Sequence, residues 1–225
     1  MIVRAPRQQV LWLVRHGETD WNRMGWVQGH LDSPRLTRRG RAQARRVASL
    51  LVTKDVGAVY SSDLRRARST ADIIGRTLGL PVQTDARLRE RSFGRLEGAP
   101  TGSLRPEVTG IVGGRIADIV AHPVEGESLT DVADRCADFV SWLGSRSGRG
   151  DIVIVAHGGT VRLLRAALAG TPLTGLSWGT VANASVHRIT YPTLPTGPLP
   201  PLAVPVGAPQ TRHPTPGLHP TPSGH

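Results

Sequence analysis

The stretch VLWLVRHGET, residues 10–19, decides the fold. Its first five residues are apolar, and a charged, glycine-containing turn follows at once. A short apolar run bounded by turn residues is typical of a strand that is buried on both faces. Two further stretches repeat the pattern, GAVY at 57–60 before SSD and DIVIVA at 151–156 before HGG. The sequence therefore predicts three buried strands, each ending in polar residues.

A helix-like segment follows each of these strands. Thr37 is a suitable N-cap for a helix that runs to about Val52 and has Ala44, Val47, Ala48 and Leu51 on one face. Similar amphipathic segments cover 63–78, 128–143 and the residues after Gly158. Strands that alternate with helices form βαβ units with a parallel sheet. We therefore expect an α/β protein, a three-layer α/β/α sandwich with a mostly parallel central sheet.

Two regions depart from this alternation. Residues 98–124 are rich in Gly and Pro, so we expect a short insertion, or cap, over the active site, with one helix at 114–121. Residues 192–225 contain 11 of the 18 prolines and no acidic residue. Such a composition is typical of disorder. The predicted organisation is one domain over 1–191 and a disordered tail over 192–225.

Composition narrows the class of protein. No run approaches the roughly 18 apolar residues of a membrane helix, and the first residues lack the apolar core of a signal peptide. We therefore expect a cytoplasmic protein with no membrane contact, either a monomer or a homodimer. The formal charge of +11 indicates an anionic partner. With two Phe, two Tyr and no nucleic-acid motif, a small phosphorylated molecule is favoured over a nucleic acid.

Reactive side chains cluster where the predicted strands end. Arg15 and His16 follow the first strand, Arg65 and Arg66 follow the second, and His157 follows the third. The carboxyl ends of parallel strands meet at one edge of a sheet, so these groups should converge there. Two guanidinium groups and two imidazoles suit a phosphoryl dianion. No phosphate-binding P-loop and no carboxylate cage for magnesium is present, so we expect no cofactor and no metal, and a histidine or water as the nucleophile.

Six motifs, in this order, resemble those of the histidine phosphatase superfamily, also called the phosphoglycerate mutase-like family. They are LVRHGETDWN (13–22), LTRRGRAQA (36–44), SSDLRRARSTA (61–71), LRERSFGRLEG (88–98), GES (126–128) and VAHGG (155–159). Together they span most of the chain before the proline-rich tail.

The resemblance implies a role for each central residue. His16 is the nucleophile and forms a phosphohistidine, while Arg15, Arg66 and His157 hold the phosphoryl oxygens. Glu90 is the proton donor, which protonates the leaving alkoxide and then helps to activate water. A nucleophilic imidazole must keep one nitrogen unprotonated, so we expect the other N–H of His16 to donate to a backbone carbonyl such as that of the next residue.

The resemblance also implies substrate contacts around this centre. Asn22 would add a hydrogen bond to the phosphate. Gln28 and Gly29 belong to a loop similar to the family's substrate-side loop, and Gly158 lies in the last motif. Glu97, close to the expected acid, stands where relatives often carry an acid or Gln that takes no part in catalysis.

The motifs are compatible with two reactions, hydrolysis of a phosphate ester and transfer of the phosphoryl group back to a substrate. Members that resemble cofactor-dependent mutases carry a long insertion between the acid and the second histidine, whereas Glu90 and His157 are only 67 positions apart here. A more hydrated pocket favours hydrolysis over return of the phosphoryl group. We therefore predict a metal-independent phosphatase acting on a small phosphomonoester. A phosphoglycerate mutase-type phosphotransferase is the alternative, followed by a non-catalytic phosphate- or nucleic-acid-binding protein.

Overall fold

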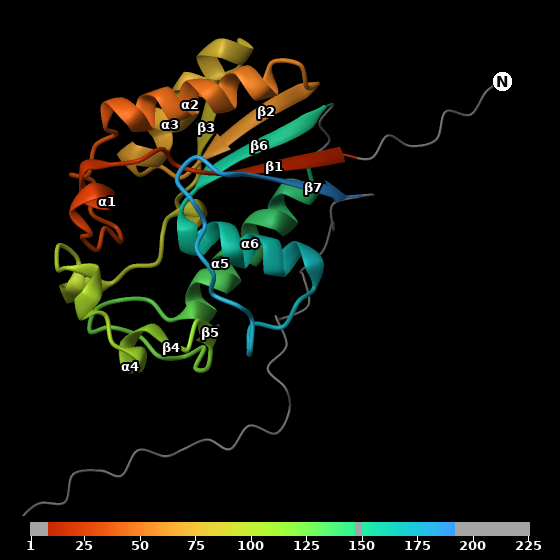
Figure 1. Cartoon of the computed structure of the whole chain (residues 1–225). Coiled ribbons are helices and arrows are strands. Elements are labelled where there is room, and N and C mark those ends of the chain that lie inside the picture. Colours follow the sequence, from red (N-terminus) through yellow and green to blue (C-terminus); the bar gives the residue numbers. More distant parts are fainter. Residues whose placement is uncertain (1–8, 147–149, 192–225) are drawn as a thin grey trace, which may run out of the picture.

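The computed structural model describes residues 9–146 and 150–191. Its centre is a five-stranded sheet with the strand order β3-β2-β6-β1-β7 (Figure 1). The strands are β1 (Gln9–Arg15), β2 (Val56–Ser61), β3 (Val82–Thr84), β6 (Asp151–Ala156) and β7 (Val186–Tyr191). The first four run parallel to one another, and β7 pairs antiparallel with β1. The prediction of a mostly parallel sheet is therefore confirmed.

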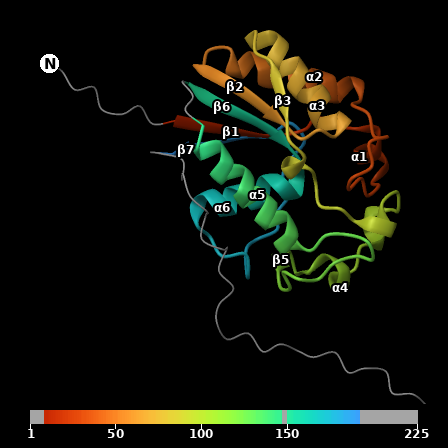
Figure 2. The same cartoon turned by 180° about the vertical axis from the view of Figure 1, so that it is seen from behind.

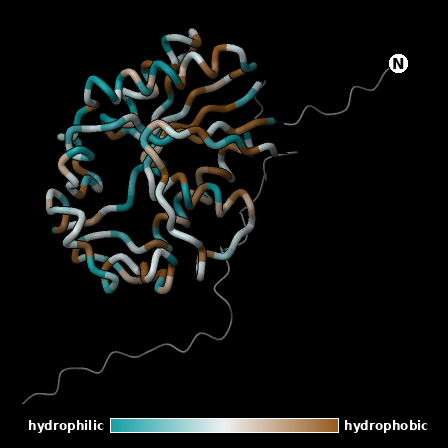
Figure 3. The backbone as a smooth tube through the Cα atoms, viewed as in Figure 1, coloured by the Kyte–Doolittle hydropathy of each residue, from teal (hydrophilic) through white to brown (hydrophobic). Residues whose placement is uncertain are grey.

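Helices cover both faces of the sheet and complete the predicted three layers (Figures 1 and 2). They are α2 (Arg38–Leu51) and α3 (Arg65–Leu78) on one face, and α5 (Leu129–Gly144) and α6 (Gly158–Ala169) on the other. Side chains of β1 alternate between the two cores: Trp12 and Val14 pack with α2 and α3, whereas Leu11 and Leu13 pack with α5 and α6. The sheet is accordingly the most hydrophobic layer of the molecule (Figure 3).

Local sequence explains where these helices begin. The Thr37 side chain accepts a hydrogen bond from the Gly40 amide at 2.9 Å and starts α2. Ser128 and Asp131 form a reciprocal capping box at the start of α5. These caps satisfy amide groups that have no partner inside the helix. The predicted helices over 37–52 and 128–143 are thus confirmed to within a residue or two.

The remaining elements lie outside these three layers, and those within residues 98–124 form the cap region. They are α1 (Asp20–Met24), the 3-10 turns η1 (Ala86–Leu88), η2 (Gly94–Leu96) and η3 (Thr101–Ser103), then α4 (Pro106–Thr109), β4 (Ile111–Val112) and β5 (Arg115–Ile116). Figures 1 and 2 show α4, β4 and β5 off the sheet, near the start of α5. A hydrogen bond of 3.1 Å from the Thr130 amide to the Ile119 carbonyl joins this region to α5.

The predicted helix at 114–121 is wrong. The structure has a two-stranded hairpin here, in which Ile111 pairs with Ile116 and Val112 with Arg115. Gly113 and Gly114 form the turn with φ values of 56° and 73°. Two consecutive residues with positive φ suit a two-residue hairpin turn, a conformation that glycine adopts without steric cost. The Gly-Gly pair therefore favoured a hairpin over a helix.

Two strands of the central sheet were not predicted. β3 has only three residues, and β7 is an edge strand that pairs with β1 alone. The sequence of β7, VHRITY, mixes polar and apolar residues because one of its edges has no neighbouring strand. Neither segment carries the continuous apolar run that marked the three buried strands.

The proline-rich segment 192–225 lies outside the described residues, so its predicted disorder stays a prediction. Among the helices of residues 9–146 and 150–191, none is long and apolar enough to cross a membrane.

The turn after β1 and the start of α2 approach each other very closely. A Cβ on Gly40 would collide with the Glu18 carbonyl oxygen, and one on Gly17 would lie 2.5 Å from the Gly40 carbonyl oxygen. The Thr37 amide donates to the Glu18 carbonyl at 2.9 Å, which fixes this approach. Glycine is therefore required at both positions for α2 to pack against the turn that carries His16.

We expect Gly40→Ala to lower the free energy of unfolding by about 1–3 kcal/mol through this collision. In an isolated helix the same replacement would stabilise by up to about 1 kcal/mol. Urea unfolding measures the difference. Gly102→Ala is the matched control, because nothing lies within 4 Å of a Cβ there. Equal stability of the two variants would contradict the steric argument.

Candidate active site

His16 lies at the carboxyl end of β1 and is 2% exposed. Its Nδ1 donates to the Gly17 carbonyl at 2.8 Å, the kind of backbone bond expected from the sequence. The Gly17 amide in turn donates to Thr70 Oγ1 of α3 at 3.1 Å. Because Nδ1 carries the proton, Nε2 keeps its lone pair. The fold thus fixes both the position and the tautomer of this imidazole.

The second histidine lies beside the first. The ring centroids of His16 and His157 are 5.2 Å apart, although the residues are far apart in the sequence. His157 Nε2 shares a hydrogen bond of 2.9 Å with Ser62 Oγ, at the end of β2. Its Nδ1 is buried and has no hydrogen-bond partner in the part of the chain that the structure describes. A bound ligand could supply that partner.

Both imidazoles are neutral. Burial is the largest cause that lowers the pKa of His16 well below its usual range, and the charges of Arg66 and Arg15 lower it further. Burial likewise lowers the pKa of His157 well below its usual range, with Arg66 as the next cause. A neutral imidazole with a free nitrogen is the nucleophilic form of this side chain.

Arg66 is almost completely enclosed, with 1% of the residue exposed. Its Nη1 donates to the Leu31 carbonyl at 2.8 Å and its Nη2 to the Gly29 carbonyl at 2.6 Å. Burial lowers the pKa of Arg66 to about 10, so the group keeps its charge at neutral pH. Arg65 and Arg68 of the same motif are exposed. The structure therefore places the predicted arginine, and not its neighbours, inside the protein.

Arg15 lies on the other side of His16. Its Nη1 donates to the Val181 carbonyl at 2.5 Å, and burial lowers its pKa. A Cβ on Gly158 would lie 3.6 Å from Arg15 Nε, so this arginine packs against the start of α6. The Nε groups of Arg15 and Arg66 are both buried and have no acceptor among the described residues. Unpaired cationic donors of this kind fit an anion.

Glu90 follows η1 and is fixed by backbone amides. Its Oε2 accepts from the Gly159 amide at 3.1 Å and its Oε1 from the Arg91 amide at 3.0 Å. A Cβ on Gly159 would collide with the carboxylate, so the glycine is needed for this contact. The Glu90 carbonyl accepts from Arg135 Nη2 and from His30 Nε2, both at 2.8 Å. The carboxylate is thus held at the N-terminus of α6, immediately after His157.

Glu97 has a different environment. Its Oε1 accepts from the His30 amide at 2.8 Å and the Phe93 amide at 3.0 Å. A Cβ on Gly29 would overlap the Glu97 carboxylate, so the two residues pack directly together. Glu97 therefore shapes the loop around Gly29, whose carbonyl holds Arg66.

Two predicted substrate-binding residues have less direct links to this centre. Asn22 Oδ1 accepts from the Thr19 amide and from Asn183 Nδ2, both at 3.1 Å. Asn183 Nδ2 also lies 3.3 Å from the His16 carbonyl oxygen, so it joins Asn22 to the loop that carries His16. Gln28 is 9% exposed, and its Oε1 has no hydrogen-bond partner within the described ranges.

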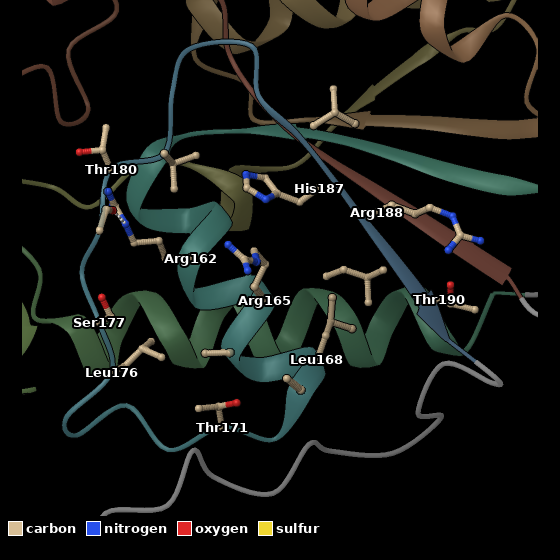
Figure 4. A pocket seen from close by; sticks show the side chains of 16 residues that line it. Arg162, Arg165, Leu168, Thr171, Leu176, Ser177, Thr180, His187, Arg188 and Thr190 are labelled. Carbon is tan, nitrogen blue, oxygen red and sulfur yellow. Dashed lines mark hydrogen bonds between the residues drawn. The ribbon is translucent and has the colours of Figure 1, made fainter.

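Sequence reasoning missed Arg162 of α6. Its Nη1 lies 3.7 Å from the position of a Cβ on Gly158, and Arg15 Cζ lies 3.7 Å from the same point, so the two cations are neighbours. Arg162 Nε donates to the Gly179 carbonyl at 2.7 Å, and the guanidinium lies over the Trp178 ring. Figure 4 shows Arg162 extending from α6 toward the loop that carries Thr180.

A signal for Arg162 was available, because it follows Gly158 by one helical turn and must share its face of α6. Asn183 had no comparable signal. It precedes β7, which the sequence did not reveal, and only the return of the chain along β1 brings it to His16.

Together these groups form a basic, largely enclosed site at the start of α6. Guanidinium donors, neutral imidazoles and helix amides can bind a phosphoryl dianion, and the adjacent carboxylate can transfer a proton. Within residues 9–146 and 150–191, no group of three or more His, Cys, Asp or Glu side chains is arranged to hold a metal ion.

The neutral histidines predict that stability falls in mildly acidic solution. Below about pH 6.5 the unfolded chain takes up protons on these residues while the folded protein does not. The free energy of unfolding should therefore fall by up to about 1.4 kcal/mol per pH unit for each histidine, until the folded-state pKa is reached. Urea unfolding of the wild type and His16→Asn between about pH 7 and 5 measures this loss.

His16→Asn should show a shallower dependence on pH than the wild type. Carboxylates with a lowered pKa, such as Glu127 at about 2, lose their contribution only at lower pH. The loss of stability caused by these carboxylates therefore falls below the pH range in which the histidines act. Parallel curves for the two proteins would contradict a neutral His16.

Comparison with known proteins agrees with this geometry. The model of the histidine phosphatase superfamily (branch 1) matches residues 11–193. Phosphoglycerate mutase-like protein 4 of Arabidopsis thaliana is 43% identical over 157 residues, 68% of this chain and 67% of that protein. The "Probable phosphoglycerate mutase GpmB" of Yersinia enterocolitica is 37% identical over 193 residues, 82% of this chain and 86% of its own.

A similar solved structure is that of a mycobacterial glucosyl-3-phosphoglycerate phosphatase in complex with VO3. It superimposes with a TM-score of 0.69 at 36% identity and covers 80% of this chain and 90% of that one. The extent of the family match and the identity to these relatives lead to one conclusion. The chain belongs to the histidine phosphatase superfamily (branch 1) and is an enzyme of the phosphatase or mutase-like kind.

Proposed function

We propose that this protein is a metal-independent phosphatase that hydrolyses a small phosphomonoester through a phosphohistidine on His16. One observation carries the proposal: His16 is neutral, buried beside His157, and its Nδ1 is held by the Gly17 carbonyl, which leaves Nε2 as the nucleophilic atom. The flanking cations Arg15 and Arg66 supply the charge that a phosphoryl dianion requires.

The first half-reaction transfers the phosphoryl group to the protein. His16 Nε2 attacks phosphorus, the bond to the ester oxygen breaks, and Glu90 gives its proton to the departing alkoxide. Arg15 and Arg66, with the imidazole of His157, stabilise the charge on the three phosphoryl oxygens. The products are a free alcohol, a phosphohistidine and an ionised Glu90.

The second half-reaction restores the enzyme. Ionised Glu90 takes a proton from a water molecule, whose oxygen attacks the phosphohistidine. The bond between phosphorus and Nε2 breaks, inorganic phosphate leaves, and His16 returns to its neutral form. Glu90 is again protonated for the next cycle. The hydrogen bonds to the Gly159 and Arg91 amides keep its carboxyl group in one place through both steps.

Hydrolysis is favoured over phosphoryl return by the short segment between the acid and the second histidine. Residues 98–124 form only η3, α4 and the β4–β5 hairpin. A small cap encloses the phosphohistidine less completely than a long insertion would, so water can reach it. The mycobacterial relative is titled a phosphatase, whereas the Arabidopsis and Yersinia relatives carry mutase names, so a mutase is the second candidate.

A non-catalytic binding protein is less well supported. Binding of phosphate would use the arginines and imidazoles alone, yet the carboxylate of Glu90 is held by two amides beside them. A negative charge there would weaken the binding of an anion, so a protein that only binds phosphate has no use for it. The proposed reaction uses the same carboxyl group for proton transfer.

The nucleophile assignment predicts that His16→Ala abolishes hydrolysis of p-nitrophenyl phosphate, because the covalent route is lost. The loss should be on the order of 1,000-fold or more in kcat/KM. Wild-type activity should persist in excess EDTA. Release of nitrophenol measures both quantities, and labelling with a ³²P-labelled phosphomonoester followed by an alkaline quench, in which phosphohistidine survives, detects the phosphoprotein in the wild type only.

Full activity of His16→Ala, or loss of wild-type activity in EDTA, would contradict the mechanism. Product analysis with 3-phosphoglycerate distinguishes the second candidate. A mutase would form 2-phosphoglycerate, whereas a phosphatase releases inorganic phosphate.

The contact between Gly159 and Glu90 predicts a second variant. Gly159→Ala should displace the carboxylate and lower kcat/KM roughly 10- to 100-fold, part of the usual worth of a general acid. Gly158→Ala is the matched comparison and should lose less, because a Cβ there meets Arg15 Nε at an ordinary distance of 3.6 Å. Equal losses in the two variants would indicate that Glu90 does not act as the acid.

A further inference from the structure

A second enclosed space adjoins Glu90. It is a cavity of about 140 Å³ between the cap region and the helices α5 and α6. Glu90 and Gly159 form part of its wall, and most of the remaining wall is apolar, with Phe93, Leu104, Ile111 and Trp178 among the lining residues. The described contacts assign no function to this cavity.

Its position matches that of a leaving group. In the proposed reaction Glu90 protonates the ester oxygen, so the carbon side of the ester must lie directly beside this carboxyl group. Glu90 and Gly159, which lies two residues after His157, both line the cavity and are joined by a hydrogen bond of 3.1 Å. The alcohol portion of the substrate would therefore enter it.

The polar groups in the wall are largely used by the protein itself. Arg91 Nε donates to the Glu127 carbonyl at 2.6 Å, Nη1 to the Thr109 carbonyl at 2.7 Å, and Nη2 to the Val108 carbonyl at 2.9 Å. Thr109 Oγ1 donates to the Arg105 carbonyl at 3.1 Å. A sugar hydroxyl in this cavity would lose its bonds to water and find few partners.

The remaining cation lies at one side of the cavity. Arg162 uses Nε for the Gly179 carbonyl and stacks on Trp178, with 4.6 Å between its Cζ atom and the ring centroid. Its Nη1 lies toward Gly158 and Arg15. Arg162 Nη1 therefore lies near the phosphoryl end, while most of the wall of the cavity is apolar.

From this placement we propose that the cavity is the subsite for the alcohol portion of the substrate, and that it takes an apolar, ring-sized group. The proposal rests on the phosphatase function above. A cavity of about 150 Å³ lined by Leu, Ile and Phe binds benzene, so a space of this size and lining fits one ring. The expected substrates are phosphate esters of apolar alcohols, and polyhydroxylated sugar phosphates are disfavoured.

The test compares benzyl phosphate with glucose 6-phosphate, both of which release an alkoxide. The wild type should show a kcat/KM about 10- to 100-fold higher for benzyl phosphate, the usual range for an added apolar group in a fitted pocket. No preference, or a preference for glucose 6-phosphate, would overturn the subsite.

Filling the cavity provides the matched variants. Ile111→Trp places an indole in the cavity and should lower kcat/KM for benzyl phosphate at least tenfold, with an unchanged inhibition constant for inorganic phosphate. Val112→Trp is the control in the same hairpin, because Val112 is 57% exposed and does not line the cavity. Leu104→Trp fills the cavity from another element and should act like Ile111→Trp. Equal loss in the filling and control variants would overturn the proposal.

Binding of benzylphosphonate, which cannot be hydrolysed, separates this proposal from the reaction. Calorimetry should detect binding to the wild type, competition by inorganic phosphate and a loss in Ile111→Trp. Such binding without hydrolysis of any ester would refute the phosphatase function and leave the apolar subsite. Hydrolysis of p-nitrophenyl phosphate without this binding pattern would refute the subsite and leave the phosphatase.

Discussion

Parallel pairing between β1 and β6 is the constraint on which the site depends. Arg15 pairs with Ala156 at the last step of the register, and the His16 amide donates to the Ala156 carbonyl at 2.9 Å. This one alignment brings His16 and His157, each of which follows its strand, to a ring separation of 5.2 Å. A shift of the register by one residue would turn either imidazole to the opposite face of the sheet. The two-histidine centre is therefore a consequence of strand alignment.

Close packing around the paired ends of β1 and β6 determines the protonation state of the two histidines. Close approach of Gly17 to Gly40 lets α2 cover the turn after β1, and α3 supplies Thr70 and Arg66 from the same side. Both imidazoles are thereby buried, and burial favours their neutral forms. The same enclosure strengthens the attraction between the arginines and an anion. Burial thus keeps both imidazoles neutral and encloses the neighbouring arginines.

Glu90 depends on a separate set of contacts. The loop that carries Glu90 is fixed by Arg135 of α5, whose nitrogens donate to the carbonyls of Arg87, Arg89 and Glu90. Arg91 then ties this loop to the cap region through backbone carbonyls. Glu90 is therefore positioned by α5, which lies on the opposite face of the sheet from α2, and by the cap region, which also lines the cavity beside Glu90.

The sequence by itself determined the three buried strands and the main helices, and it placed His16 and His157 at strand ends that converge. These features follow from local periodicity, from caps, and from the rule that strand ends converge. It did not reveal β7, the Gly113–Gly114 hairpin, or the places of Asn183 and Arg162. The tertiary structure decided these, together with the satisfied donors of Arg91 and the cavity beside Glu90. The reason is physical. Edge strands, hydrogen bonds between distant residues and cavities all arise from contacts between segments far apart in the chain, and no local sequence pattern predicts such contacts.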